Sequence, residues 1–214
     1  MIIAIDGPSA AGKSTIAKLL AKELGVEYID TGAMYRAVAL KAIQSGADID
    51  DEAELALLLD STDIDLAGTQ VLLDGEDVSG RIRTEDVSMQ ASRISAIPAV
   101  RKKLVALQRE IGGRKSVVMD GRDIGSNVFP DAEYKFFITA SPGVRAERRR
   151  KELADRGEDV PFENVLADIE KRDWDDSHRD LNPLIQTDDA ILIVTDDLSI
   201  EKVLKKEIQW LNSI

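Results

Sequence analysis

Cysteine is absent from this chain of 214 residues. Its absence excludes disulfide bonds and thiolate metal sites, and it fits a reducing compartment. Long apolar runs are also missing, because a run such as 190–194 falls far short of the roughly 20 residues that cross a bilayer. The N-terminal stretch MIIAIDG has no basic lead and no small-residue cleavage site. We therefore expect a soluble, cytoplasmic protein without a signal peptide.

Basic residues are outnumbered by acidic ones. The sequence has 28 Lys plus Arg against 40 Asp plus Glu, which gives a net charge of −12. This charge repels a polyanion on average, so we expect neither nucleic acid nor a membrane as a partner. A chain of this length forms one well-buried core more readily than two independent catalytic domains. We expect a single domain and a monomer, although the sequence leaves the oligomeric state open.

Short β-branched runs alternate with segments of helical periodicity along the chain. This alternation is typical of an α/β fold in which helices flank a parallel sheet. Helices are predicted over 13–24 and 33–44, each followed by a glycine, Gly25 or Gly46, because glycine commonly ends a helix. Five runs are predicted to form the core strands: 2–5, 26–29, 116–119, 133–138 and 190–194.

The segment between the second and third strands is long, at roughly 85 residues against the dozen or so that a crossover needs. It must hold a subdomain, which we place at 31–114. Within it, 62–66 and 70–73 alternate around Ala67-Gly68, and Asp74-Gly75 is a turn signal, so we predict an antiparallel hairpin. Pro98 is predicted to begin a helix that stops at Gly112-Gly113.

A last helical pair is predicted after the fourth strand. The first helix covers 141–154, with Ser141 and Pro142 as its cap, and the second runs from Phe162 to about Ser177. A polar turn at 155–161 separates them.

The sequence from Gly7 to Ser14, GPSAAGKS, fits the phosphate-loop pattern G-x-x-x-x-G-K-[ST]. It lies between a predicted strand and a predicted helix, which is the context that such a loop requires. In this motif backbone N–H groups surround the phosphates of ATP, Lys13 reaches the β and γ phosphates, and Ser14 offers a hydroxyl to Mg²⁺. The expected ATP-binding residues are Gly7, Pro8, Ser9, Ala10, Ala11, Gly12, Lys13, Ser14 and Thr15.

Asp120 follows the buried run SVVM, at the place where phosphate-loop proteins carry a second Mg²⁺-binding carboxylate. An Asp at a strand end is more often a cap or a turn former, so this assignment depends on the phosphate loop. With that loop, the sequence predicts Ser14 and Asp120 as the metal ligands.

Guanine-nucleotide switches read guanine with an N-K-x-D segment, which is missing here. An ATPase or an ATP-binding regulatory module passes that test. The arginines outside the loop favour a kinase for a small phosphorylated acceptor, because two nucleotides bound together bring many negative charges to one place. A phosphate monoester is mostly dianionic at neutral pH and can attack without a general base.

Three sets of arginines fit such a role. Arg36 follows the second strand; Arg172, Asp176 and Arg179 are spaced to share one helical face; Arg145, Arg149 and Arg156 are spaced to share another. Each set has a plainer interpretation. The third, with Arg148 and Arg150, can pair with Glu147 and Glu152 on a solvated surface, and the second can pair with Asp168, Asp173 and Asp175.

Six segments in register resemble the bacterial-type cytidylate kinases along nearly the whole chain. They are IDGPSAAGKST, IDTGAMYRAVAL, LDGEDVSGRIRT, ASRISAIPAVR, MDGRDIGSNVFPDA and RDWDDSHRDLNPL. The resemblance implies a phosphate-loop kinase fold with a monophosphate-binding subdomain at 31–114 and a lid at 145–160. It implies transfer of a phosphate from ATP to CMP or dCMP with Mg²⁺. The sequence departs from the related enzymes at Trp174-Asp175 and His178, and Thr31 stands where Ser is common.

The resemblance also implies roles for single residues. Thr31, Arg36 and Arg122 would hold the phosphate or sugar of CMP, and Ser92, Arg101 and Asp123 would read cytosine. The substrate-binding set is Thr31, Tyr35, Arg36, Ser92, Arg101, Asp120, Arg122, Asp123, Arg172, Asp176 and Arg179. The catalytic set is Lys13, Arg122, Arg172, Arg179 and Arg149, although the sequence leaves open which lid arginine contacts the transferring phosphate.

Three alternatives stay open at this point. The acceptor can be UMP or another monophosphate, and the protein can be an ATP-binding regulatory module. Asp123 can merely cap its loop or pair with Arg122.

Overall fold

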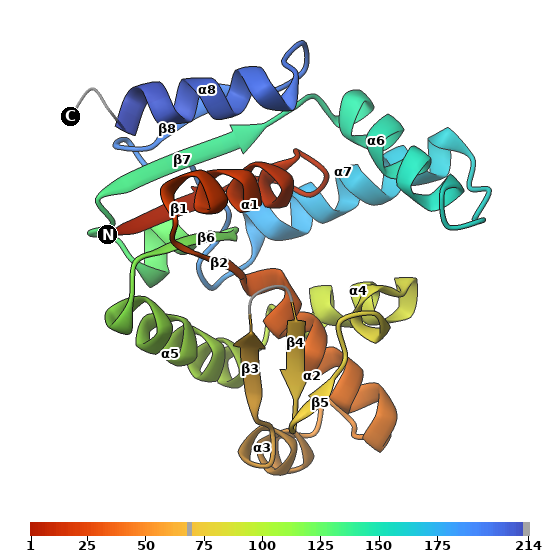
Figure 1. Ribbon diagram of the computed structural model, residues 1–214. Coiled ribbons are helices and arrows are strands. Elements are labelled where there is room, and N and C mark those ends of the chain that lie inside the picture. Colours follow the sequence, from red (N-terminus) through yellow and green to blue (C-terminus); the bar gives the residue numbers. More distant parts are fainter. Residues whose placement is uncertain (68–69, 212–214) are drawn as a thin grey trace. The chain divides into compact units, whose positions relative to one another are not determined.

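The computed structural model describes residues 1–67 and 70–211, and it divides into two compact units (Figure 1). Unit 1 combines the two ends of the chain, Met1–Val26 and Ser116–Ile214. Unit 2 is the segment between them, Glu27–Lys115. Among the described residues, no helix is long and apolar enough to cross a bilayer.

The main sheet has five strands in the order β2-β6-β1-β7-β8. They are β1 (Ile2–Asp6), β2 (Glu27–Asp30), β6 (Val117–Gly121), β7 (Tyr134–Thr139) and β8 (Ile191–Val194). β1 pairs in parallel with both β6 and β7, which places Ile5 opposite Asp120 on one side and Phe136 on the other. The predicted five-stranded parallel sheet is confirmed, and its strands begin and end within two residues of the predicted places.

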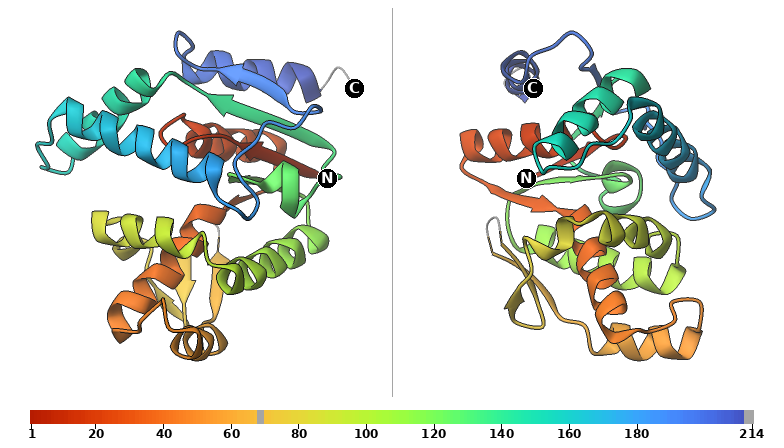
Figure 2. Two further views of the ribbon diagram at one scale, coloured as in Figure 1. Left: turned by 180° about the vertical axis from the view of Figure 1, so that it is seen from behind. Right: turned by 90° about the vertical axis from the view of Figure 1, so that its right-hand side faces the viewer.

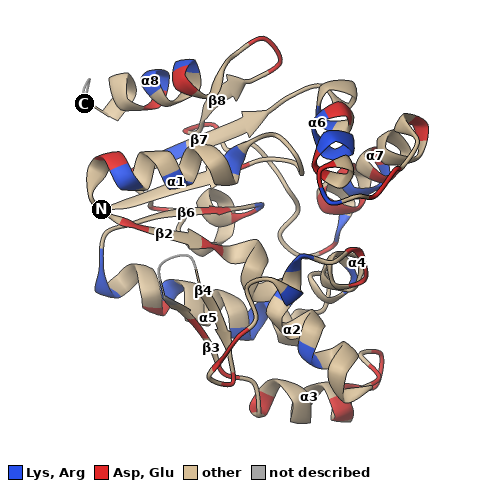
Figure 3. Cartoon of the chain, turned by 45° about the vertical axis from the view of Figure 1, so that its right-hand side comes forward, with Lys and Arg blue, Asp and Glu red and all other residues tan. Residues whose placement is uncertain are grey.

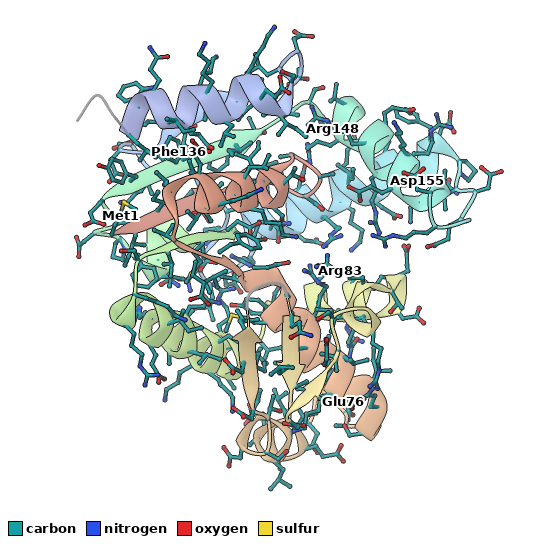
Figure 4. The ribbon with its side chains drawn as sticks, in the orientation of Figure 1. Met1, Glu76, Arg83, Phe136, Arg148 and Asp155 are labelled. Carbon is teal, nitrogen blue, oxygen red and sulfur yellow. The ribbon has the colours of Figure 1, made fainter. Side chains whose placement is uncertain are left out.

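The centre of this sheet is apolar on both faces. Ile3, Ala4 and Ile5 in β1 are completely buried, and so are the neighbouring residues Val117 to Met119 in β6. Phe136, which Figure 4 labels on β7, is among the largest buried side chains. Continuous apolar runs of this kind are typical of parallel strands covered on both sides.

Helices cover the two faces of the sheet in unit 1. α1 (Lys13–Leu24) and α8 (Ile200–Leu211) pack together on one side, and α7 (Phe162–His178) lies on the other (Figure 2, right). α6 (Pro142–Ala154) packs against α7. α1 ends where predicted, at Gly25 with a left-handed φ of 66°. Ser141 occupies the N-cap position of α6 but makes no side-chain cap hydrogen bond, so the predicted cap rests on Pro142.

Unit 2 consists of helices and a small antiparallel sheet, and it has a core of its own. Its helices are α2 (Thr31–Ser45), α3 (Glu52–Asp60), α4 (Glu85–Ile94) and α5 (Pro98–Arg114), with a 3-10 turn at Arg81–Arg83. Its sheet has the order β3-β4-β5, with β3 (Ile64–Ala67), β4 (Gln70–Leu73) and β5 (Glu76–Asp77). Met34 and Leu104, from α2 and α5, are completely buried in this core.

The predicted hairpin is present and has a third strand. β3 and β4 pair antiparallel, and the predicted turn Asp74-Gly75 joins β4 to β5 with φ values of 52° and 84°. Two successive positive φ values are typical of the tight turns that connect hairpin strands. Gly68, in the other predicted turn, lies outside the described residues.

Three helices were not predicted, and one predicted helix ends later than expected. α5 does not stop at Gly112-Gly113 but continues to Arg114, because neither glycine takes the left-handed conformation that ends a helix. The sequence analysis predicted none of α3, α4 and α8. α3 begins at a conventional cap, since the Asp51 carboxylate accepts from the N–H groups of Ala53 and Glu54.

Glu207 is an acidic side chain in the apolar face of α8. It is completely buried beside Val203, and within the described part of the chain neither carboxylate oxygen has a hydrogen-bond partner. Burial raises the pKa of Glu207 to about 8. Folding raises the pKa of this carboxyl group. The folded protein therefore loses stability as the pH rises from the pKa of the unfolded state to that of the folded state, because ionisation favours the unfolded chain.

We predict that Glu207→Gln stabilises the protein in a pH-dependent way. Each unit of pKa difference is worth about 1.4 kcal/mol, so the gain should be small near pH ~5 and largest above pH ~8. Thermal unfolding should then occur about 5 °C or more higher in the variant. Glu201→Gln, an exposed position in the same helix, is the control. A difference in unfolding temperature that is independent of pH would show that the carboxyl is not buried as described.

Candidate active site

The loop between β1 and α1 has the backbone shape of an anion-binding turn. Gly7, Ala10 and Gly12 have positive φ values of 144°, 57° and 93°. A Cβ at Gly7 would lie 2.0 Å from the carbonyl oxygen of Ile138 in β7, so only glycine fits there. α1 begins directly after Gly12, and the amides at its N-terminus are therefore available to a phosphate.

Lys13 and Ser14 begin this helix, and each has a definite partner. The Lys13 ammonium donates to the carbonyl oxygen of Pro8 at 2.7 Å and is 5% exposed. Ser14 Oγ donates to Asp120 Oδ2 at 2.7 Å. The two side chains predicted to bind Mg²⁺, from positions 106 residues apart, are thus in contact.

These two oxygens are a chemically suitable pair for Mg²⁺. The ion prefers hard oxygen ligands and is usually held by one or two carboxylates together with substrate phosphates and water. The described residues contain no cluster of three or more His, Cys, Asp or Glu that could hold a metal by themselves. A site made by Ser14 and Asp120 would therefore need a nucleotide to complete it.

Lys13 lies in a cluster of buried charges. Burial lowers its pKa to about 7, and the positive charge of Arg122 adds to this effect. Asp120, Asp6 and Asp176 oppose it. A phosphate beside Lys13 would supply further negative charge and hold the ammonium in its protonated form.

Two ion pairs lie next to this cluster. Arg122 Nε donates to Asp176 Oδ2 at 2.8 Å, and Arg179 Nη2 donates to Asp123 Oδ1 at 3.3 Å. Burial alone would raise the pKa of Asp176, but Arg122, and after it Arg179 and Arg172, keep that pKa below its usual value. Asp123 pairs with Arg179 and also accepts from Asn127, whereas the sequence analysis had named Arg122 as a possible partner.

The two predicted helical faces are only partly correct. α7 ends at His178, so Arg179 lies one residue beyond the helix and only Arg172 and Asp176 share its face. α6 ends at Ala154, so Arg156 also lies outside its helix. Each helix therefore ends before the last residue of the face that was predicted for it.

α6 carries several basic residues, which are blue in Figure 3, and their partners divide them into two groups. Arg149 pairs with Glu152 at 3.3 Å and Arg150 pairs with Glu147 at 2.8 Å, which are ion pairs of the kind that the plainer interpretation predicted. Arg145 is different, because it is 2% exposed, pairs with Asp173 and donates to the carbonyl oxygen of Ser9 at 3.2 Å.

Arg148 joins Arg145 in supporting the phosphate loop. Its guanidinium donates to Thr195 Oγ1 at 3.0 Å and to the Thr195 carbonyl oxygen at 2.7 Å. Thr195 Oγ1 in turn donates to the carbonyl oxygen of Ala11 at 3.2 Å. Figure 4 labels Arg148 within α6 and Asp155 just beyond its end. The plainer interpretation, in which Arg148 pairs with Glu147 or Glu152 on a solvated surface, is wrong for this residue, because the fold brings Thr195 to it.

The remaining predicted residues lie in unit 2, near the start of α2, near the end of α4 and near the start of α5. Arg36 Nη2 donates to both carboxylate oxygens of Asp30, at 3.0 and 3.3 Å, and Asp30 also caps α2 by accepting from the N–H of Ala33. Thr31 is 3% exposed at the first residue of α2.

Arg101 and Ser92 lie at the junction of α4 and α5. Arg101 is 3% exposed, donates to the carbonyl oxygen of Ser95 at 3.1 Å, and lies over the ring of Tyr35 at 5.9 Å. Ser95 Oγ donates to the carbonyl oxygen of Ser92 at 2.7 Å. Unit 2 therefore brings Tyr35, Ser92 and Arg101 into one neighbourhood.

Comparisons with known proteins agree on one family. A family model described as cytidylate kinase matches residues 3–213. The chain belongs to the cytidylate kinase family. A cytidylate kinase of Clostridioides difficile (strain 630) is 47% identical over 212 residues, covering 99% of this chain and 98% of the relative. A cytidylate kinase of Caldanaerobacter subterraneus subsp. tengcongensis is 52% identical over 204 residues, covering 95% of this chain and 91% of the relative.

Solved structures support the fold of this cytidylate kinase family member. An uncharacterized protein from Eubacterium ventriosum aligns with a TM-score of 0.57 at 15% identity and covers 100% of this chain and 99% of its own. A shikimate kinase from Bacteroides thetaiotaomicron aligns with a TM-score of 0.50 at 14% identity, covering 99% and 98%. At such low identity these likenesses show the kinase fold alone.

We predict that Lys13→Ala lowers kcat by roughly two orders of magnitude or more while the fold is kept, because a buried ammonium acts most strongly on charge that develops during transfer. Initial rates of ADP formation measure kcat, and circular dichroism shows whether the fold is kept. Lys22→Ala, in the exposed last turn of the same helix, is the matched control. Turnover close to that of the control would remove Lys13 from the reaction.

Proposed function

We propose that this member of the cytidylate kinase family moves the terminal phosphoryl group of ATP to CMP or dCMP, with Mg²⁺. One observation carries the proposal. In unit 1 a phosphate loop, a Ser14–Asp120 contact and the ion pairs of Arg122 and Arg179 surround one buried cluster of charges. Such a cluster suits a reaction in which two phosphate groups must be brought together.

The donor half of the reaction would use the phosphate loop. Residues 7–15 would surround the phosphates of ATP with N–H groups, and Lys13 would exchange its contact with the Pro8 carbonyl for phosphate oxygens. Ser14 and Asp120 would hold Mg²⁺, which when bound neutralises charge on the β and γ phosphates. Arg145 and Arg148 would keep the loop in shape through their contacts with Ser9 and Thr195.

The acceptor half would use arginines that are already paired with carboxylates. Arg122 and Arg179 are held by Asp176 and Asp123, and Arg172 lies one turn before Asp176. A monophosphate dianion would accept hydrogen bonds from these guanidinium groups, since each carries five N–H donors in a planar fork that suits phosphate oxygens. The acceptor oxygen needs no general base because the phosphate is already ionised.

Unit 2 would supply further acceptor contacts. Thr31 and Arg36 would hold the phosphate or sugar, and Ser92, Tyr35 and Arg101 would lie along the base. The ion pair of Asp30 with Arg36 supports this role, because it holds a guanidinium at the start of α2. We propose the range 31–114 as the monophosphate-binding subdomain.

The segment 145–160 would act as a lid over ATP. Arg149 is our candidate for the transferring phosphate, and its present partner Glu152 is exposed and weakly held. Closure over the reacting groups would exclude water and prevent hydrolysis of ATP.

Asp123 is the proposed reader of cytosine. Cytosine carries an amino donor at position 4, where uracil carries a carbonyl acceptor, and a carboxylate accepts from that amine. Asp123 is 5% exposed, so a uracil carbonyl placed against it would bring two desolvated acceptors face to face, at a cost of about 1–3 kcal/mol. Its ion pair with Arg179 fixes the carboxylate in place.

An acceptor screen tests the reaction class and the base together. ADP formation is measured with Mg²⁺ and ATP alone, and then with each monophosphate in turn. We expect CMP and dCMP to accelerate ADP formation far more than UMP, AMP or GMP do. A higher rate with UMP would favour a kinase for another monophosphate, and a slow rate unchanged by all of them would favour an ATP-binding regulatory module.

We predict that Asp123→Asn and Asp123→Ala lower kcat/KM for CMP far more than for UMP. The ratio of the two should fall about tenfold for every 1.4 kcal/mol of lost discrimination. Asp168→Asn, at an exposed position of α7, is the control. Equal losses with both acceptors would move the reading of cytosine to Ser92 and Arg101.

A further inference from the structure

Asp6 is a buried carboxylate at the last residue of β1, immediately before the phosphate loop. It is 6% exposed. Its two oxygens accept from two consecutive backbone amides of a distant segment: Oδ1 from the N–H of Ile124 at 2.8 Å, and Oδ2 from the N–H of Gly125 at 2.7 Å. The function proposed above uses neither Asp6 nor these amides.

The two amides begin a short turn of π-helix, Ile124–Val128, whose N-cap residue is Asp123. The first N–H groups of a helical turn have no partner within it and are usually bonded by the side chain of the N-cap residue, for which Asp is among the preferred types. Here the Asp123 side chain makes no cap hydrogen bond. Asp6 takes that place from more than 100 residues away in the chain.

Because Asp6 caps the turn, the Asp123 carboxylate has other partners. Asp123 Oδ2 accepts from Asn127 Nδ2 at 3.0 Å, and Oδ1 accepts from Arg179 at 3.3 Å. A self-capping Asp123 would have to aim an oxygen at the amides of Ile124 or Gly125 instead. The cap supplied by Asp6 therefore decides which way the proposed cytosine reader points.

We infer that Asp6 is a positioning residue for acceptor selection: its carboxylate caps the turn after Asp123 and so leaves the Asp123 carboxylate to face Arg179 and the acceptor base. The inference deepens the proposed function and rests on it.

Neighbouring residues leave Asp6 little freedom to move. The next residue, Gly7, lies against the Ile138 carbonyl oxygen so closely that no side chain fits. A Cβ at Gly125 would meet the Lys135 side chain at 3.1 Å and Asp6 Oδ2 at 3.4 Å. Lys135 is itself held by Pro130 and Asp189. The phosphate loop and the turn after Asp123 are thus attached to each other through one side chain.

An uncharged substitute should not reproduce this contact. Burial raises the pKa of Asp6 to about 6, although the two amides favour the ionised form. Holding an ionised carboxylate at this buried position therefore lowers the stability of the folded protein. Asparagine has nearly the same shape but only one acceptor, and its amide group would face one backbone N–H with another donor.

The test compares acceptors in Asp6→Asn and in wild type. We expect kcat/KM for CMP divided by that for UMP to fall about tenfold or more, as in Asp123→Asn, and hydrogen exchange of the Ile124 and Gly125 amides to become faster. In the double variant Asp6→Asn with Asp123→Asn, the ratio should fall little further. Asp189→Asn is the control for general loosening, because Asp189 holds Lys135 beneath the same turn; it should leave the ratio unchanged.

Gly125→Ala provides a second route if Asp6→Asn does not fold. The added methyl group presses on the held Lys135 side chain and on Asp6 Oδ2, so it should stretch the cap contact and lower the CMP to UMP ratio by about threefold or more. A ratio that stays at the wild-type value in either folded variant, or falls equally in Asp189→Asn, would overturn the positioning role. A wild-type protein without preference for CMP would instead overturn the proposed function, and the positioning role with it.

Discussion

The buried charges around Lys13 are the constraint on which the arrangement of the site in unit 1 depends. An ammonium at 5% exposure is costly unless opposite charges surround it, and Asp6, Asp120 and Asp176 provide them. Arg122 lies close enough to oppose the ammonium, and it is balanced by Asp176. Each carboxylate in this cluster also holds something else: Asp120 holds Ser14, Asp176 holds Arg122, and Asp6 holds the turn after Asp123.

This arrangement explains why a binding site for phosphates can exist in a protein with a net charge of −12. Each acidic residue of the site contacts a cation, a hydroxyl or backbone amides. The carboxylates therefore hold the positively charged side chains in place, and these side chains can still donate to a phosphate. Preorganised donors of this kind stabilise developing charge better than donors that must first reorient. The phosphate loop has the same property, since Arg145, Arg148 and Thr195 hold its carbonyl groups from outside.

The sequence predicted what depends on short-range patterns. The phosphate loop, its strand and α1 follow from glycine spacing and apolar periodicity within about 25 residues, and the turn at Asp74-Gly75 follows from two residues. The pairs Arg122–Asp176 and Arg179–Asp123 could not be predicted, because their members are 54 and 56 residues apart and meet only after the strands are in register. The cap by Asp6 could not be predicted for the same reason. A charged residue at the end of an apolar strand did, however, indicate that Asp6 has a specific partner. α8 was missed although Ile200, Val203, Leu204, Ile208 and Leu211 keep a helical period, so short-range pattern could have predicted it.

The central claim is that this network holds ATP and a cytidine monophosphate together for direct transfer. The most direct measurement is the affinity of bisubstrate analogues by titration calorimetry, comparing adenosine joined to cytidine through a phosphate chain with the same compound carrying uridine. The account predicts one site per chain and binding of the cytidine compound tighter by about tenfold or more, which is about 1.4 kcal/mol. Equal affinity for the two compounds, or binding no tighter than that of ATP alone, would contradict it.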